Sequence, residues 1–468
     1  MSQWQPVQIV GGAYADDTRP FSCQDTVNYL PLQAERPGGR SDWLLRSAPG
    51  FRQFATTQNK PVRGAHDAEG LFLVVAGRTL YRVNTNGSTA SIGTIPGVGR
   101  VSFAHNQIEN GNQIVIVNGQ AGYVWNTVAG ALTQITDEAF PGSPIADFMD
   151  GYIIGVDPFG RFWFISDLTQ ATQYSTLDRQ DAESQPDKIV TAIVVGDLVL
   201  VFGERTGEFF ENTGADTGTF QRVRGVTMDV GCASAHARAR LDNSVYWLGS
   251  DGNVYRLVGN SPQRISTAAI EQAIAGLNWS NAFAQTFEDR GHKLFVLTFP
   301  DGHTWQFDVL SQEWSRRQSN GLKRWRLNTL TKWRRQWYGG DFSNGKLYQL
   351  DWDEMTEDGA PLVSERVTAV THADGNPVVV DGVLLVFDVG RVDVGVSDHF
   401  CSISYSDDGG HNWSNPAIVS IGKAGEFRRS VELRRLGMTR ERVWKVSVSS
   451  PAKRDLIAAS WKAAGARS

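Results

Sequence analysis

Residues 315–335 carry a dense group of basic side chains that could bind anions. The segment holds eight basic residues and no acidic one, with Trp325 and Trp333 among them. One hypothesis is a surface that faces DNA, where guanidinium groups meet phosphates without reading bases. The other is a solvated edge or a subunit contact, complementary to the acidic stretch at 351–358, and this is favoured because charge runs are usually solvated or interfacial. The basic residues are Arg316, Arg317, Lys323, Arg324, Arg326, Lys332, Arg334 and Arg335.

A second basic segment lies at residues 423–454, with ten basic and three acidic residues. The sequence VWKVSV at 443–448 alternates apolar and polar residues, which predicts a strand with one charged face. Arginine's planar fork suits carboxylates of a protein partner as well as phosphates, so we predict a protein interface, with a plain solvated face as the alternative. The candidate residues are Arg428, Arg429, Arg434, Arg435, Arg440 and Arg442.

The segment SDDGGHNW at 406–413 is similar to the Asp-box hairpin of sialidases and related propellers. Ser406, Asp408, Gly410 and Trp413 match that pattern, while Asn412 stands where threonine is usual. The aspartate of such a turn accepts hydrogen bonds from backbone N–H groups, and the glycines adopt dihedral angles unfavourable to other residues. We therefore predict a structural turn rather than a catalytic site.

Motifs of enzymes and of metal or cofactor sites are missing from the sequence. There is no Gly-x-Ser-x-Gly elbow, no phosphate-binding Gly-rich loop followed by Lys-Ser/Thr, and no His-Glu-x-x-His. The eight histidines are dispersed without ligand spacing, and His105 is expected to be a structural hydrogen-bonding residue. We predict a protein with no catalytic residue, no cofactor and no metal.

Composition limits the classes of partner and compartment. The net charge of −5 disfavours a dedicated nucleic-acid binder, and the longest apolar run, at 189–203, is too short to cross a bilayer. The first twelve residues lack the basic and apolar regions of a signal peptide. Three widely spaced cysteines predict buried free thiols in a protein that folds in a reducing cytosol.

A repeat of about 44 residues organises most of the chain. Each unit has several short apolar or aromatic segments separated by turns such as Glu69-Gly70 and Asp150-Gly151, which suit two-residue hairpins. Four strands per repeat at this period predict an all-β protein with a β-propeller of about seven blades, six to eight being compatible. The first strands are expected to begin near Arg63, Arg100, Ile145, Ile189, His236, Ala282 and Trp325.

Three regions follow from this pattern. Residues 1–62 are rich in turn formers and predict an arm that wraps or docks and that could supply a closing strand to the ring. Residues 63–367 are the propeller, interrupted by one short helix that Ser266 or Thr267 caps and that has Ile270, Ile274 and Leu277 on one face. Residues 368–468 predict a separate β-sandwich.

Several short segments resemble the packaged-DNA stabilisation proteins, or tail hub (nozzle) proteins, of short-tailed bacteriophages. They occur in the order and approximate spacing of that family, so that the resemblance covers nearly the whole chain. They are NYLP (28–31), LRSAPG (45–50), GRVSFAH (99–105), FWFISDL (162–168), AESQPD (182–187), STAAIE (266–271) and the C-terminal run at 405–461.

The resemblance implies a structural protein of the virion tail, assembled in the host cytoplasm, with no catalysis and no stable membrane insertion. Such a hub is expected to form a homo-oligomeric ring, a hexamer, beneath the portal and its adaptor. It would extend the channel through which DNA passes without sequence readout, and help to retain packaged DNA. It would also hold tailspikes or tail fibres and receive a needle or plug protein.

A glycan-binding or glycan-hydrolysing β-propeller with an appended β-sandwich is the alternative function. It is suggested by the Asp-box-like turn. An enzyme of the sialidase kind should carry several such boxes, one in each blade, and an arginine triad around a tyrosine. The chain has one box, and it lies outside the repeats. The tail hub is therefore favoured.

Overall fold

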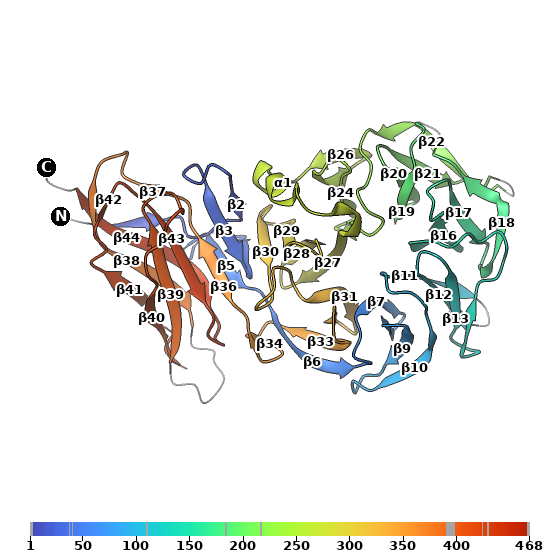
Figure 1. Cartoon of the computed structure of the whole chain (residues 1–468), viewed down its shortest axis with the longest axis horizontal. Helices are drawn as coiled ribbons and strands as arrows, with labels where there is room; N and C mark the ends of the chain where they lie inside the picture. The colour runs from blue at the N-terminus through green and yellow to red at the C-terminus, as the bar shows by residue number, and fades with distance from the viewer. Residues whose placement is uncertain are drawn as a thin grey trace.

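Four-stranded antiparallel sheets follow one another around a ring in the computed structural model, which describes residues 3–465 except 37, 40, 109–110, 183–184, 216–217, 390–397, 424 and 428–429 (Figure 1). The first strand of each sheet begins within two residues of its predicted position. These first strands lie innermost, where β7 contacts β11, β11 contacts β15, and β31 contacts β7. The all-β propeller predicted from the repeat is therefore confirmed.

Six blades draw all four strands from consecutive sequence. They are β7 (Val62–Ala68), β8 (Leu71–Ala76), β9 (Thr79–Val83) and β10 (Thr89–Thr94); β11 (Ser102–Ile108), β12 (Gly111–Val117), β13 (Gly122–Asn126) and β14 (Ala131–Gln134); β15 (Ala146–Met149), β16 (Tyr152–Val156), β17 (Trp163–Asp167) and β18 (Gln170–Gln180); β19 (Ile189–Val195), β20 (Leu198–Gly203), β21 (Gly207–Asn212) and β22 (Phe220–Met228); β23 (Arg238–Leu241), β24 (Ser244–Leu248), β25 (Val254–Val258) and β26 (Ser261–Arg264); β27 (Phe283–Asp289), β28 (His292–Thr298), β29 (Thr304–Asp308) and β30 (Trp314–Arg317).

A seventh blade closes the ring with a strand from the N-terminal region. It consists of β31 (Leu327–Trp333), β32 (Gln336–Asp341), β33 (Lys346–Asp351) and β6 (Gly50–Thr56). β6 pairs antiparallel with β33, from Gly50 opposite Asp351 to Thr56 opposite Lys346. Two segments almost 300 residues apart in sequence thus share one sheet, and the blade forms only when both are present.

Aromatic side chains hold the seventh blade against the first. The rings of Phe72 and Trp333 lie 5.3 Å apart between centroids, and Tyr338 packs against both. The indole of Trp333 also donates a hydrogen bond to the carbonyl of Gly70 at 2.8 Å. Aromatic pairs of this kind contribute about 0.5–1.5 kcal/mol each beyond the burial of their area.

Tight turns explain why the strands are so short. Glu69 and Gly70 have φ angles of 51° and 89°, and Asp150 and Gly151 have 51° and 91°, as a type I′ hairpin requires. The dipeptide Asp301-Gly302 has the same type of sequence, for which a two-residue hairpin is likewise predicted, but its structure differs. It lies in a longer loop between β28 and β29, and Gly302 does not adopt a positive φ.

One short helix, α1 (Ala268–Ile274), follows the fifth blade. The side chain of Thr267 caps it by accepting a hydrogen bond from the backbone N–H of Ile270, and Ile270 and Ile274 are buried. The cap and these two buried residues match the prediction, whereas Leu277, predicted on the same face, lies beyond the last helical residue. No helix among the described residues is long and apolar enough to cross a membrane.

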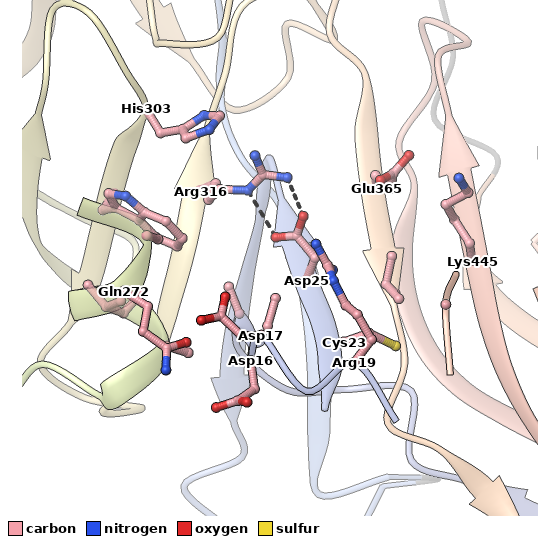
Figure 2. Close-up of a pocket in the computed structure, with 18 of the residues that line it drawn as sticks. Asp16, Asp17, Arg19, Cys23, Asp25, Gln272, His303, Arg316, Glu365 and Lys445 are labelled. Atoms are coloured by element: carbon pink, nitrogen blue, oxygen red, sulfur yellow. Dashed lines mark hydrogen bonds and ion pairs between the residues drawn. The ribbon is translucent and has the colours of Figure 1, made fainter. Parts of the chain in front are cut away.

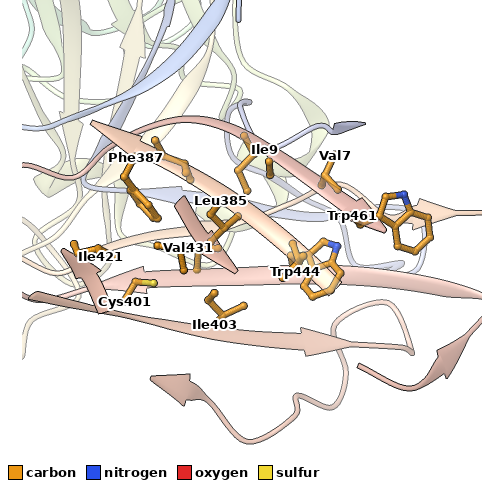
Figure 3. Close-up of a cluster of buried hydrophobic side chains, with 14 of the residues drawn as sticks. Val7, Ile9, Leu385, Phe387, Cys401, Ile403, Ile421, Val431, Trp444 and Trp461 are labelled. Atoms are coloured by element: carbon orange, nitrogen blue, oxygen red, sulfur yellow. The ribbon is translucent and has the colours of Figure 1, made fainter. Parts of the chain in front are cut away.

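The C-terminal region is a β-sandwich completed by N-terminal strands. One sheet contains β4 (Tyr29–Gln33), β5 (Trp43–Ser47), β44 (Asp455–Gly465), β38 (Val378–Asp388) and β41 (Ser430–Arg434), with β1 (Gln3–Val7) on β44 and β42 (Met438–Thr439) on β38. The other contains β36 (Ser364–Val367), β43 (Glu441–Val448), β39 (His399–Ser406) and β40 (Ala417–Gly422). Buried side chains from both sheets, including Leu385, Ile403, Trp444 and Trp461, form the core between them (Figure 3).

A single strand joins the propeller to the sandwich. β3 (Cys23–Val27) pairs in parallel with β30 of the sixth blade and antiparallel with β36 of the sandwich, and β2 (Tyr14–Ala15) pairs with its other end. One hydrogen-bonded sheet therefore continues from one domain into the other (Figure 1). Residues 1–62 are shared among the sandwich, the joint and the seventh blade. The predicted limit at 367 falls at the end of β36, a strand of the sandwich, so we propose that the arm ends at residue 62 and the propeller before Ser364.

Candidate functional site

The eight basic residues of the first cluster do not form one surface. Lys323, Lys332, Arg334 and Arg335 are exposed, and Arg316 and Arg326 are half-buried. Arg317 and Arg324 are buried. The expectation of a common DNA-facing or solvated surface is therefore wrong for Arg317 and Arg324, because their guanidinium groups point into the protein.

Arg317 ties three parts of the chain together. Its guanidinium lies 3.3 Å from the carboxylate of Glu357, and both side chains are only 1% exposed. It also donates hydrogen bonds to Asn28 Oδ1 at 3.1 Å and to the carbonyl of Pro49 at 2.6 Å. Burial lowers the pKa of Arg317 to about 10, so that it stays charged at neutral pH. The basic cluster was expected to be complementary to the acidic stretch at 351–358. At Arg317 this complementarity takes the form of an internal ion pair with Glu357.

Arg316 and Arg326 also have internal partners. Arg316 forms an ion pair with Asp25 on β3, and Arg326 lies 3.0 Å from Asp341 on β32. Only the exposed residues at the turn between β31 and β32 keep the character of a surface cluster. Arg334 and Arg335 adopt positive φ angles there, and Arg334 covers the ring of Trp333 at 5.3 Å.

A pocket of about 450 Å³ lies at the joint between propeller and sandwich. The Asp25–Arg316 ion pair stands at its centre, with Glu365 and Lys445 on the sandwich side and His303 on the propeller side (Figure 2). Charges of both signs line it, together with the apolar side chains of Trp305 and Trp413.

The pocket offers little for catalysis. Burial raises the pKa of the Cys23 thiol and of Glu365, and burial lowers that of His303, which disfavours a nucleophilic thiolate and a charged imidazole. Among the described residues no group of three or more His, Cys, Asp or Glu side chains could hold a metal ion. The arrangement suits a contact between elements better than a reaction.

The Asp-box-like turn is held by the hydrogen bonds expected of it. Asp408 Oδ1 accepts from the backbone N–H groups of His411 at 3.1 Å and Asn412 at 2.9 Å, and Ser406 Oγ accepts from Gly410 N at 2.8 Å. These bonds hold the pKa of Asp408 well below its usual range. The indole of Trp413 packs beside Gly410 and carries Lys445 on its face at 4.5 Å.

Like the first cluster, the second basic cluster contains both buried and exposed arginines. Arg428 and Arg429 lie outside the described residues. Arg442 is buried, so the prediction of a protein interface is wrong for this residue. Its guanidinium forms a two-pronged ion pair with Asp407 at 2.6 and 2.9 Å. It also lies 4.0 Å from the ring centroid of Tyr405. Its role is therefore to hold β43 to the Asp-box-like turn.

The exposed arginines of this cluster flank an apolar surface, here called the sandwich patch. Trp4, Val379 and Met438 are 41%, 40% and 64% exposed, and Met438 pairs with Val379 across β42 and β38. The ring of Trp4 lies beside Gly382, which is opposite Arg434 on β41. Aromatic, methionine and arginine side chains are enriched in protein interfaces. The patch consists of Trp4, Val379, Met438, Arg434, Arg435 and Arg440.

The predicted structural role of His105 is supported by its contacts. Its Nδ1 lies 2.9 Å from Nε2 of His66, and the imidazole of His66 stacks on Phe103. Burial lowers the pKa of His66 to about 3, with a smaller effect from His105, so that His66 is neutral at pH 7. This histidine pair joins the inner strands of the first two blades.

Comparison with known proteins gives matches to both domains. The family model described as "Bacteriophage P22 Gp10, beta-propeller" matches residues 5–355, and "Bacteriophage P22 Gp10, beta-sandwich" matches residues 364–464. A curated relative, the tail hub protein gp10 of Salmonella phage P22, is 26% identical over 320 residues. That alignment covers 63% of this chain and 65% of the relative, which is less than two thirds of the relative's length.

Among solved structures, the computationally designed Ika8 protein matches 64% of this chain and 99% of its own. The TM-score of 0.39 and the identity of 12% are too low to carry an argument about fold or function.

Proposed function

The chain belongs to the family of bacteriophage P22 Gp10, in which a β-propeller is followed by a β-sandwich, and we propose that it is a structural subunit of a phage tail hub. The observation that carries this proposal is the match of both domain models in order along the chain. The continuous sheet through β3 supports it, because a joint built from backbone hydrogen bonds makes the two domains a stiff building block. The protein would belong to the virion tail and assemble in the host cytoplasm.

Subunits of this kind would form a closed ring, which we propose to be a hexamer. A head-to-tail contact between two different surfaces closes into a ring when the rotation between copies is suitable. We assign the sandwich patch as one side of that contact, with a neighbouring copy of the chain as its occupant. Exposed apolar side chains beside arginines that are not engaged in the core support this assignment.

The ring would extend the DNA channel beneath the portal adaptor and help to retain packaged DNA. DNA would pass without sequence readout, since a channel through which DNA slides should not grip its bases. Lys323, Lys332, Arg334 and Arg335 are the exposed members of the first cluster, and we propose that they contact protein rather than DNA. Tailspikes or fibres and a needle protein would bind other surfaces of the ring.

Imaging of the purified full-length chain by negative-stain electron microscopy tests this proposal. The wild-type protein should form rings with six-fold symmetry, and Met438→Asp should leave monomers because it places a charge within the contact. Ile418→Asp is the matched control, since Ile418 is 65% exposed on the opposite sheet, and this variant should still form rings.

Three outcomes would count against parts of the proposal. Wild-type monomers at every concentration would refute the ring, and rings formed by Met438→Asp would refute the sandwich patch. Absence of the chain from particles of the phage that encodes it would refute the tail hub itself. Release of sugars from glycans by the purified protein would favour the glycan-active propeller instead.

A further inference from the structure

Three arginines and a histidine gather at one end of the tunnel that the inner strands enclose. Arg100 lies two residues before β11, His236 and Arg238 lie at the start of β23, and Arg324 lies three residues before β31. Because the inner strands of a propeller run in the same direction, residues at their beginnings lie at the same end of the tunnel. The second, fifth and seventh blades therefore each place an arginine at this end, although Arg238 is turned towards Thr191 of the fourth blade.

Contacts between these residues cross the tunnel. Arg100 and Arg324 donate to the same atom, Asn328 Oδ1, at 3.2 and 3.4 Å. Both guanidinium groups also lie over the ring of Phe283, the first residue of β27, at 3.8 and 5.4 Å from its centroid. Arg100 thus reaches from the second blade to the sixth and seventh, which brings two positive charges next to each other.

The carboxylates nearest to this group are engaged elsewhere. Asp147, which is near Arg238, lies 3.0 Å from Arg240, and Asp341, which is near Arg324, lies 3.0 Å from Arg326. In the part of the chain that the structure describes, no ion pair within 4 Å involves Arg100, Arg238 or Arg324.

The pKa values of Arg100 and His236 are lowered, as expected where positive charges lie close together without a counter-charge. Burial and Arg324 lower the pKa of Arg100 to about 9. Burial, Arg100 and Arg238 lower the pKa of His236 to about 3, so that this imidazole is neutral at pH 7. Charges removed from water without a counter-charge are unfavourable, and a bound anion would relieve that cost.

Hydrogen-bond donors remain available to such an anion. The side chain of Arg100 makes one hydrogen bond to the described residues, to Asn328, and that of Arg324 makes two, to Asn328 and to the carbonyl of Trp325 at 3.0 Å. Each guanidinium has five N–H donors. Arg324 is buried, whereas Arg100 is half-buried, so that solvent reaches the pair from the side of Arg100.

We propose that this end of the propeller tunnel binds a dianionic oxyanion of the phosphate class, held by Arg100 and Arg324. The planar fork of arginine matches two oxygens of such an ion, and a dianion offsets more of the positive charge than a single carboxylate does. The site is independent of the ring contact and of the tail-hub role. The bound ion would hold the blades together around this end of the tunnel.

Thermal unfolding of the full-length protein in phosphate, compared with chloride at equal ionic strength, tests the proposal. Inorganic phosphate at 100 times its Kd should raise the midpoint by about 3 °C. Calorimetric titration of the same protein should give a saturable phosphate site. Arg100→Lys and Arg324→Lys keep the charge but lose the fork, and each should weaken phosphate binding at least about tenfold.

Arg335→Lys is the matched control, because Arg335 is exposed at the turn between β31 and β32. It should bind phosphate like the wild type. Should one lysine variant fail to fold, the other gives the same comparison, since the two arginines come from different blades. An equal response to phosphate and chloride would overturn the proposal, as would unchanged phosphate binding in the lysine variants. A response to N-acetylneuraminic acid without one to phosphate would also overturn it, and would indicate a sugar carboxylate site.

Discussion

Replacing Arg366 by methionine should loosen the joint between propeller and sandwich. Arg366 lies on β36, is fully buried, and holds the N-terminal segment through its guanidinium group. Methionine matches the apolar part of the arginine side chain and has no charge, so that it keeps that packing but donates no hydrogen bond. The acceptors are the carbonyls of Ile9 at 2.7 Å and Gly12 at 2.8 Å, Thr26 Oγ1 at 2.8 Å, Gln24 Oε1 at 2.8 Å and the carbonyl of Asp25 at 3.4 Å.

The magnitude follows from the four shorter contacts. Leaving one buried acceptor without a donor costs about 1 kcal/mol or more, and water entering the joint would recover part of this. We therefore expect the free energy of unfolding to fall by about 3–5 kcal/mol. Arg335→Met is the control, because Arg335 is exposed, and its effect should stay within about 0.5 kcal/mol.

Urea unfolding followed by tryptophan fluorescence gives the stability, and amide hydrogen exchange locates the change. Exchange should quicken in β2, β3 and the residues between β1 and β2, while the inner strands of the first five blades keep their protection. A loss below about 1 kcal/mol, or unchanged exchange in β3, would refute the idea that Arg366 fastens the N-terminal segment.

Two further predictions concern buried cationic or titratable groups. His66 and His236 have folded-state pKa values of about 3, below the unfolded value of about 6.5. The free energy of unfolding should therefore fall as the pH drops below 6.5. At pH 5 the loss is about 2 kcal/mol for each residue. Urea unfolding midpoints measured from pH 7 to 5 should show this loss, and His66→Asn should make the midpoint depend less steeply on pH. Midpoints that do not change between pH 7 and 5 would contradict the prediction. Arg442→Met should lower the free energy of unfolding by about 2 kcal/mol, because it leaves Asp407 unpaired. Arg435→Met, at an exposed position, should not. Equal effects of the two variants in calorimetry would contradict this prediction.

Local features of the fold could be predicted from the sequence because they depend on neighbouring residues. The period of the repeat and the turns at Glu69-Gly70 and Asp150-Gly151 determine where strands begin, and the first strands lie within two residues of the predicted positions. The helix cap at Thr267 is likewise local.

Contacts between distant residues could not be predicted in this way. Arg317 looked like part of a surface run, but its partner Glu357 is 40 residues further along the chain. Arg442 looked like an interface residue, and its partner Asp407 is 35 residues away. Charge density along a sequence therefore does not distinguish a solvated arginine from one that is buried against a carboxylate brought in by another strand.

The same reason explains why the tunnel arginines went unnoticed. Arg100, Arg238 and Arg324 come from three blades and are separated by more than 80 residues at each step. Only their common position at the beginning of inner strands places them at the same end of the tunnel, where Arg100 and Arg324 share Asn328. That signal is present in the repeat, since aligning the units places all three near the same register position.

The pairing of β6 with β33 has a consequence for biosynthesis. During translation β6 emerges early, but its partner at Lys346–Asp351 appears only after six blades have been made. Pairing between segments so distant in sequence is slow, because the entropy of a long loop must be lost first. A nascent or prematurely terminated chain therefore carries an open ring with unpaired strand edges. Closure of the seventh blade would mark the propeller as complete, whereas most of the sandwich and of its patch is synthesised only afterwards.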